Sequence, residues 1–228
     1  LAAYGYEIIE PETGYLACGD TGSGKLPDEE LLVQHIIKEL HYEKDLLGKN
    51  ILITAGATIE SIDPVRFISN HSTGKMGFAL ANNAIKRGAK VTVIAAHTQA
   101  SIPPFITLIR VNSAAEMFEK VKELSPHMDI IIKAAAVADY TPSTYADEKV
   151  KKTDEDLSIP LTRTTDILAY LGSHRMDHQF LCGFSMETEH MVENSVKKLH
   201  KKHIDMIIAN NLKQTGAGFG TDTNIVTI

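Results

Sequence analysis

Apolar and polar residues follow two different periods along most of the chain. From Lys49 onward, short apolar runs alternate with stretches in which apolar residues recur at helical spacing. The apolar runs predict strands at 50–57, 89–96, 106–111, 128–137, 179–184 and 205–209. The stretches between them predict a helix from 72–77 to Arg87 and helices at 114–124, 165–172 and 189–203. This order predicts an α/β fold, a Rossmann-like three-layer sandwich with a mostly parallel sheet and helices on both faces.

The predicted helices also show their ends and their apolar faces. Ser113 with Glu116 forms a capping-box pattern before the helix at 114–124, and Gly88 is typical of a helix C-terminus. The expected apolar faces are Met76, Ala79, Leu80 and Ala84 in the helix that ends at Arg87, and Val192, Val196, Leu199 and His203 in the helix at 189–203. Segments 57–71 and 140–148 are expected as loops, and Pro160 favours an edge strand at 157–162.

Residues 1–47 differ from the rest of the chain. A short apolar run and a Gly-rich, turn-prone stretch precede a predicted helix at 28–47, which Gly48 ends. We therefore expect two parts, 1–47 and 48–228. The chain starts without Met or a signal-peptide pattern, and its last residues, 216–228, read as a Gly-rich loop and a strand. We expect a piece of a longer protein, cut at both ends.

Charge and composition narrow the possible classes of function. A net charge of −6 argues against a surface that binds nucleic acid or an anionic membrane. No apolar run approaches the roughly 18–20 residues of a membrane span. Cys18 and Cys182 stand far apart without a CxxC pattern, so we expect no disulfide framework and a cytoplasmic location. The ten histidines lack zinc-site spacing, so metal ligation by histidine is not expected.

Three segments are expected to meet at one edge of the predicted sheet. They are 54–58, 135–140 and 184–188, and each follows or closes a predicted parallel strand. Ligands of such sheets bind beyond the carboxyl ends of the strands. The sequence therefore predicts the binding site at this edge.

The first segment has glycines but no standard nucleotide motif. Gly56 stands alone, so the dinucleotide fingerprint is missing, and Ser69 and Met76 break the P-loop pattern around Lys75. Gly74 and Gly77 either let backbone amides approach a phosphate at the helix N-terminus or only allow close helix–strand packing. Asn70 could donate to a carbonyl or phosphoryl oxygen without carrying charge. An Asx-turn or helix N-cap is the commoner role of such an asparagine.

The second and third segments carry charged side chains. Asp139 could accept from a ribose hydroxyl or bind a metal ion, and Lys149 could place its charge near phosphates. The alternative for Lys149, Lys151 and Lys152 is a solvated strand edge. Lys198 and Lys202 are four residues apart on one helix face and could hold a triphosphate. The alternative for this pair is an ordinary solvated helix face.

Taken together, these segments resemble a known enzyme family. The blocks ILITAGAT, IDPVRFISNHSTGKMGFALA, AAAVADYTP, EKVKK, GFSMETE and KKLHKKHIDMIIANN resemble phosphopantothenate–cysteine ligases, above all the bacterial form that uses CTP. The resemblance covers residues 48–228. The preceding GYLACGDTGSGKLP resembles the C-terminal end of phosphopantothenoylcysteine decarboxylases, which often share a chain with the ligase in bacteria.

The resemblance implies a two-step reaction and its cofactors. The carboxylate of 4'-phosphopantothenate attacks the α-phosphate of CTP, in the presence of Mg²⁺, to give an acyl-cytidylate and pyrophosphate. The amine of cysteine then attacks the acyl group and releases CMP. The resemblance further implies a homodimer, with loop 59–71 ordered by the partner chain, and FMN for the decarboxylase part.

The resemblance also implies roles for individual residues. Asn70 matches the asparagine that holds the intermediate, and Lys149 matches the lysine that contacts the nucleotide. Cys18 matches the proton donor of the decarboxylase and is expected to be idle here. The expected CTP site comprises Gly56, Lys133, Ala134, Ala135, Asp139, Lys149, Thr165, Asp166, Ile167, Leu168, Phe184, Lys198 and Lys202, with Asp139 also a candidate Mg²⁺ ligand. Thr165 departs from the family pattern, which has proline there.

Two other classes of function are weighed against the ligase. A Rossmann-like NAD(P)-dependent oxidoreductase would carry the dinucleotide fingerprint and an acidic residue after the second strand, and VIAAHTQ offers none. A non-catalytic nucleotide-binding module would have no need of both Asn70 and Lys149. Both residues are present, so the ligase is the preferred interpretation.

Overall fold

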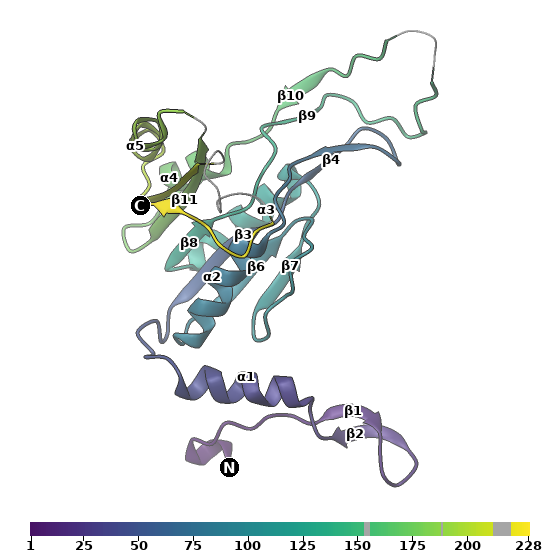
Figure 1. The fold of residues 1–228 in the computed structure, drawn as a ribbon, viewed down its shortest axis with the longest axis vertical. Helices are drawn as coiled ribbons and strands as arrows, with labels where there is room; N and C mark the ends of the chain where they lie inside the picture. Colours follow the sequence, from purple (N-terminus) through teal and green to yellow (C-terminus); the bar gives the residue numbers. More distant parts are fainter. Residues whose placement is uncertain (153–155, 188, 212–219) are drawn as a thin grey trace. The chain divides into compact units, whose positions relative to one another are not determined.

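The computed structural model describes residues 1–152, 156–187, 189–211 and 220–228. The chain divides into two compact units, Leu1–Glu43 and Lys44–Ile228 (Figure 1). Each unit is described by itself below.

The first unit is a small hairpin followed by a helix. After the 3₁₀ turn η1 (Ala2–Tyr4), strands β1 (Glu12–Tyr15) and β2 (Thr21–Lys25) pair antiparallel. Helix α1 (Glu29–Leu40) starts at Asp28, whose side chain accepts from the Glu30 amide at 2.9 Å. The predicted helix at 28–47 therefore ends earlier than expected: residues 41–44 are not helical, and 45–48 form a turn. No residue of α1 is buried, and Cys18 lies exposed in the β1–β2 turn.

The second unit is built on a seven-stranded sheet in the order β13-β12-β11-β8-β3-β6-β7. All neighbouring strands are parallel except β12 and the edge strand β13, which pair antiparallel. This confirms the predicted α/β fold with a mostly parallel sheet. The strands are β3 (Asn50–Ala55), β6 (Lys90–Ala95), β7 (Thr107–Arg110), β8 (Ile130–Lys133), β11 (Phe180–Glu187), β12 (Met206–Asn211) and β13 (Val226–Thr227). The predicted loop before β13 lies mostly outside the described residues.

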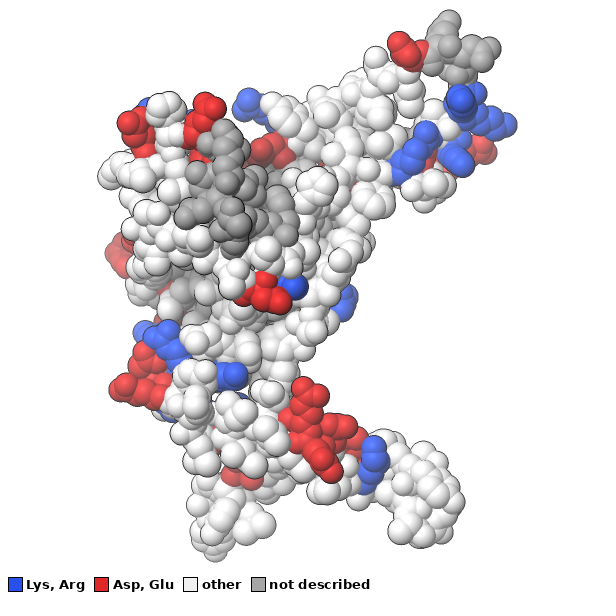
Figure 2. Space-filling model, in the orientation of Figure 1, with Lys and Arg blue, Asp and Glu red and all other residues white. Residues whose placement is uncertain are grey.

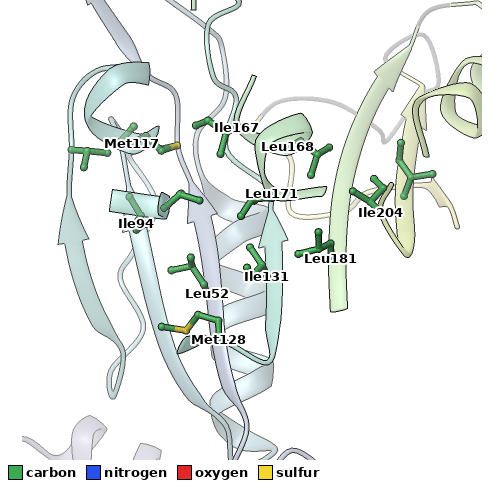
Figure 3. Packing of buried hydrophobic residues seen from close by; sticks show 14 residues of the cluster. Leu52, Ile94, Met117, Met128, Ile131, Ile167, Leu168, Leu171, Leu181 and Ile204 are labelled. Atoms are coloured by element: carbon green, nitrogen blue, oxygen red, sulfur yellow. The ribbon is translucent and has the colours of Figure 1, made fainter. Parts of the chain in front are cut away.

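Two hydrophobic clusters cover the two faces of the sheet, as the alternation along β3 requires. Leu52 packs in one cluster, whereas its neighbours Ile51 and Ile53 pack in the other, because successive strand residues point to opposite faces. Figure 3 shows the first cluster, in which Leu52, Ile131 and Leu181 lie beside Leu168 and Leu171 of a covering helix.

The helices begin at or near the predicted positions. They are α2 (Lys75–Lys86), α3 (Ala114–Leu124) with the 3₁₀ turn η2 (Ser125–His127), α4 (Ile167–His174) and α5 (Met191–Lys201). The Ser113 side chain accepts from the Glu116 amide at 3.2 Å, as predicted. The Glu116 carboxylate reaches back to the Asn112 amide at 2.8 Å, one residue further than a standard capping box.

Two predicted helix faces are confirmed only in part: Ala84 of α2 is buried, and Leu80 of α2 and Leu199 of α5 pack against the hydrophobic clusters, but other predicted residues do not. In α2 the buried residues are Gly77, Phe78, Ala81, Ala84 and Ile85, so the packed face is rotated from the predicted one and Ala79 is exposed. In α5, Val192 and Val196 are exposed and Ser195 is buried. Of the predicted α5 face, Leu199 packs against the first cluster, and the neighbouring Lys198 is partly buried, since long lysine stems can cover apolar surface.

Two segments expected as loops contain short paired strands. Residues 57–71 form a hairpin of β4 (Ile59–Ser61) and β5 (Phe67–Ser69). β9 (Tyr140–Pro142) pairs antiparallel with β10 (Leu161–Arg163), and this pair replaces the edge strand predicted at 157–162. We call the described residues between β9 and β10, 143–152 and 156–160, the arm; Figure 1 shows it reaching away from the sheet.

Candidate functional site

The predicted meeting of segments at the sheet edge is confirmed for the first two. β3, β8 and β11 are neighbours in the sheet, so their carboxyl ends share one edge. The Ala136 amide donates to the Gly56 carbonyl at 2.9 Å, and the Thr58 amide donates to the Ala136 carbonyl at 3.1 Å. The third segment joins through β11, where Gly183 pairs with Lys133; Thr188 lies outside the described residues.

Close packing accounts for the glycines of the first segment. Gly56 has a φ of 81°, and a Cβ on it would stand 2.5 Å from the His97 carbonyl oxygen. A Cβ on Gly77 would stand 2.7 Å from the Ala55 Cβ, where α2 lies against β3. Lys75 donates to the Gly220 carbonyl at 2.9 Å and to Asp222 at 2.8 Å, unlike a P-loop lysine free to reach a phosphate. These contacts favour the packing alternative at the start of α2.

Asn70 lies where the first two segments meet. Its side-chain Nδ2 donates to the Ala136 carbonyl at 3.2 Å, and the residue is exposed. It is not a helix cap, because Gly74 occupies the N-cap position of α2. The preceding Ser69 donates to the Thr58 carbonyl at 2.8 Å and holds the end of β5 against the first segment. The Asn70 side-chain amide is therefore held near the carboxyl ends of β3 and β8.

Charged side chains gather at the end of β8, where α4 begins and α5 ends. We call Lys133, Lys198 and Lys202, with Asp166, the basic edge. Lys202 donates to the Asp166 carboxylate, which also accepts from the Ala169 amide at 3.0 Å and so caps α4. Burial raises the pKa of Asp166, but the hydrogen bonds from Lys202 and Ala169, together with the charges of Lys202 and Lys133, hold the net pKa below its ordinary value.

Lys133 is the most perturbed cation of the basic edge. Burial lowers its pKa to about 8, and the neighbouring Lys198 and Lys202 lower it as well, against the opposing influence of Asp166 and Asp139. Three ammonium groups with one carboxylate leave an excess of positive charge at the strand ends. Such a cluster suits an anion with several charges, such as a nucleoside triphosphate.

The other residues predicted for the CTP site are divided by burial. Ile167 and Leu168 are buried in the first hydrophobic cluster, so only their backbone could reach a ligand. Thr165 and Asp139 are exposed; Ala134, Ala135 and Phe184 are partly buried. The Asp139 carbonyl accepts from the Thr164 amide at 3.0 Å, which ties the second segment to the start of α4.

A protein-only metal site is absent from the described residues. No group of three or more His, Cys, Asp or Glu side chains lies close enough among them to hold a metal ion. Asp139 could therefore serve only as a single ligand beside the phosphates of a bound nucleotide, a mode common for Mg²⁺. Likewise, no described helix is long and apolar enough to cross a membrane.

Lys149 lies on the arm and is exposed, as are Lys151 and Lys152. Figure 2 shows basic side chains gathered on this arm. The arm extends away from the sheet (Figure 1), and Val150, next to Lys149, is hydrogen-bonded to Asp63 and Arg66 in the turn of the β4–β5 hairpin rather than to the basic edge.

The sequence reasoning missed two buried carboxylates, Glu60 and Asp63. Glu60 accepts from the Ala114 amide at 2.9 Å, and Asp63 binds Arg66 and the arm. The spacing of Asp63 and Arg66 in IDPVRF, with proline between them, was the signal that could have indicated a turn closed by an ion pair.

Comparisons with known proteins show which proteins this chain is similar to. The chain is 48% identical, over 229 residues, to the coenzyme A biosynthesis bifunctional protein CoaBC of Bacillus subtilis, covering 98% of this chain and 56% of that protein. It is 46% identical to a cysteine/cysteine sulfinic acid decarboxylase from an unknown prokaryotic organism, covering 100% of this chain and 65% of that protein. The chain thus spans only between about half and two thirds of these relatives.

Solved structures share the fold. The C-terminal domain of a coenzyme A biosynthesis bifunctional protein CoaBC matches with a TM-score of 0.65 at 44% identity, covering 73% of this chain and 79% of that one. A mutant of Cab2 in complex with phosphopantothenate-cysteine matches with a TM-score of 0.64 at 18% identity, covering 82% and 81%, which shows the fold alone. The family model of the DNA/pantothenate metabolism flavoprotein C-terminal domain matches residues 46–228. The chain belongs to this family of DNA/pantothenate metabolism flavoprotein C-terminal domains.

Proposed function

We propose that this chain carries out the CTP-dependent ligation of 4'-phosphopantothenate to cysteine in coenzyme A biosynthesis, through an acyl-cytidylate. The observation that carries the proposal is the basic edge, which lies at the carboxyl ends of the strands beside the segments that position Asn70. The relatives named CoaBC, which match nearly the whole chain, support the same pathway.

In the first step, a carboxylate oxygen of 4'-phosphopantothenate forms a bond to the α-phosphorus of CTP, and pyrophosphate leaves. Lys133, Lys198 and Lys202 would hold the phosphates and stabilise the charge that develops on the leaving group. Asp139 and the nucleotide phosphates would hold Mg²⁺, which when bound neutralises phosphate charge. Phe184 and the small residues Ala134 and Ala135 would leave room for the base and ribose.

In the second step, the cysteine amine bonds to the acyl carbon and CMP leaves with the former carboxylate oxygen. Asn70 would donate to the oxygen of the tetrahedral intermediate, because its Nδ2 has a second hydrogen beyond the one given to Ala136. Lys149 would add positive charge from the arm, which is held beside the β4–β5 hairpin at the neighbouring Val150.

We further propose that the protein acts in the cytoplasm as a homodimer. Large apolar side chains are exposed on both hairpins, namely Val65 and Phe67 near and on β5, Tyr140 and Leu161 on β9 and β10, and Tyr145, Leu157 and Ile159 on the arm. Exposed apolar surface of this extent is typical of an interface. A second copy that covers these hairpins would bury this apolar surface, and sedimentation of the intact protein would detect it.

The intact protein is further proposed to decarboxylate the product to 4'-phosphopantetheine with FMN, with Cys18 as proton donor. The described residues of Leu1–Glu43 form one hairpin and one helix, so no step of that reaction is derived from them.

The test of the ligase is release of pyrophosphate by the intact protein with CTP, 4'-phosphopantothenate and Mg²⁺, followed by CMP when cysteine is added. Protection against heat by CTP without pyrophosphate would instead indicate a nucleotide-binding module. Reduction of NAD(P) with no response to CTP would indicate the oxidoreductase. Either result would contradict the proposed function.

A further inference from the structure

The buried carboxylate of Asp63 holds two hairpins together. Its Oδ1 accepts from the amides of Val65 and Arg66, both at 2.8 Å. Its Oδ2 accepts from the Arg66 side chain, at 3.0 Å from Nε and 2.6 Å from Nη2, and from the Val150 amide at 3.1 Å. Four of these contacts stay within the turn of the β4–β5 hairpin, and the fifth reaches the arm.

Arg66 completes the link from the same hairpin. Its Nη2 also donates to the Val150 carbonyl at 2.7 Å, so both backbone polar groups of Val150 are bound by one ion pair. A second contact, from the Ala146 amide to the Ile62 carbonyl at 3.0 Å, fixes the arm four residues earlier. The arm is thus anchored immediately beside Lys149, although Lys149 itself is exposed.

The anchoring hairpin is in turn fixed to the sheet. The buried Glu60 of β4 accepts from the Ala114 amide at the start of α3, and the Ile59 amide donates to the Asn112 carbonyl at 2.8 Å. The same hairpin ends one residue before Asn70. One chain of hydrogen bonds therefore runs from the sheet through the β4–β5 hairpin to both Asn70 and the neighbour of Lys149.

A buried carboxylate is costly unless its hydrogen bonds are satisfied, and this one is satisfied by an Arg fork and three backbone amides. A turn of five residues needs no such group merely to close. What the ion pair adds is a fixed position of Val150 relative to the hairpin.

We propose that Asp63 is a positioning residue that, through Arg66 and Val150, sets the place of Lys149 relative to Asn70. The proposal rests on the proposed ligase function. It predicts that loss of the Asp63 charge releases the arm and removes the contribution of Lys149, while the basic edge still binds the nucleotide.

The first test measures the hydrogen bond between the Val150 amide and Asp63 directly and does not depend on enzymatic activity. Hydrogen exchange of the Val150 amide in the intact protein is expected to be faster by about tenfold or more in Asp63→Asn, because a hydrogen bond to a charged acceptor is lost. The matched control is Asp45→Asn, which disrupts an exposed bidentate pair with Arg87 elsewhere in the unit and should leave the Val150 amide unchanged. Unchanged exchange in Asp63→Asn would overturn the proposal.

The second test asks whether Asp63 acts through Lys149. Asp63→Asn is expected to lower kcat by about 10²-fold, as displacement of a catalytic group by about 1 Å can do, with the KM for CTP changed by less than about threefold. Adding Asp63→Asn to Lys149→Gln should not lower kcat further, since Asp63 is proposed to act on turnover through Lys149. Effects that multiply in full, or normal turnover in Asp63→Asn, would overturn the proposal.

A second variant covers the case in which Asp63→Asn does not fold. Val150→Pro removes the amide that donates to Asp63 and leaves the Asp63–Arg66 pair in place, while it also fixes φ at position 150 and restricts the backbone of Lys149. It is expected to lose turnover to a similar extent, and full activity would overturn the proposal. If the wild-type protein releases no pyrophosphate, the ligase function fails for a separate reason, and the exchange measurement still decides whether Asp63 holds the arm.

Discussion

The basic edge and the two hairpins present their functional side chains in different ways. Lys133, Lys198 and Lys202 stand on a strand end and along one helix, partly buried, and Asp166 accepts from Lys202. Asn70 and Lys149 are exposed and stand beside or beyond short strands of three residues. The first region is held by the core of the domain, whereas the second depends on a few hydrogen bonds and one buried ion pair.

This difference suggests a division of labour. Rigid elements hold side chains precisely enough to bind a highly charged nucleotide before the reaction starts. Hairpins can move over a substrate and complete the site afterwards. Variants of the hairpins should therefore change turnover, and variants of the basic edge should change nucleotide affinity.

Among the variants of the hairpins, Asn70→Asp should lower activity the most. The new carboxylate cannot donate and repels phosphoryl oxygens, so coupling to cysteine should fall by about 10³-fold, near the upper range for loss of one stabilising donor. Pyrophosphate release before cysteine is added should fall much less. The two half-steps are measured separately by pyrophosphate and CMP release, and normal cysteine coupling would refute the role of Asn70.

Lys149→Gln should lower turnover by about 10²-fold while the affinity for CTP stays nearly constant. The reason is that, in the proposed function, the basic edge rather than Lys149 would provide most of the phosphate contacts. Steady-state kinetics with a separate measurement of CTP binding checks this, and Lys151→Gln is the matched control on the same arm. Unchanged kinetics in Lys149→Gln would make Lys149 an ordinary solvated residue.

The charge of the basic edge should make the affinity for CTP depend on pH. The pKa of Lys133 is lowered to about 8, so the side chain loses its charge as pH rises through that value. A bound triphosphate favours the charged form, so CTP should bind about tenfold more weakly at pH 9 than at pH 7. Calorimetric titration measures this, and Lys133→Met should flatten the dependence. An equally steep profile in Lys133→Met would assign the titration to another group.

The smallest expected effect is the loss of stability that the Asp63–Arg66 ion pair contributes when the pH becomes acidic. The Arg66 side chain holds the pKa of Asp63 well below its usual range, despite burial that raises it. A carboxyl with a lowered folded-state pKa stabilises the fold above its unfolded pKa of about 4, and this stabilisation disappears as pH falls through the folded value. The difference in free energy of unfolding between wild type and Asp63→Asn should therefore be largest near neutral pH and shrink below about pH 4. Urea unfolding at several pH values measures it, and a difference that grows in acid would contradict the assignment.

The sequence predicted the core of the fold better than its periphery. The apolar run at 50–57 and the cap at Ser113 specify β3 and α3 locally, and both appear close to where they were expected. The hairpins of 57–71 and β9–β10 were missed, because three-residue strands with polar residues carry no clear period. Their pairing is set by contacts distant in sequence, such as Val150 with Asp63.

The candidate site divides in the same way. The meeting of 54–58 with 135–140 follows from the parallel sheet and was predicted. The face of α5 was predicted only in part. An apolar pattern places Val192 and Val196 on the packed face in preference to a lysine, but both valines are exposed, and Lys202 has Asp166 as a partner from another helix. That partner lies 36 residues away and cannot be seen in the period of one helix. Roles of the individual residues stay predictions until the variants are measured.

The most direct test of the central claim follows one oxygen atom. The intact protein would be given 4'-phosphopantothenate labelled with ¹⁸O in its carboxylate, together with CTP, Mg²⁺ and cysteine, and the products would be analysed by mass spectrometry. Attack of the carboxylate on the α-phosphorus predicts that one labelled oxygen appears in the phosphate of CMP. Label in orthophosphate together with release of CDP, or CMP without label, would contradict the acyl-cytidylate and with it the proposed function.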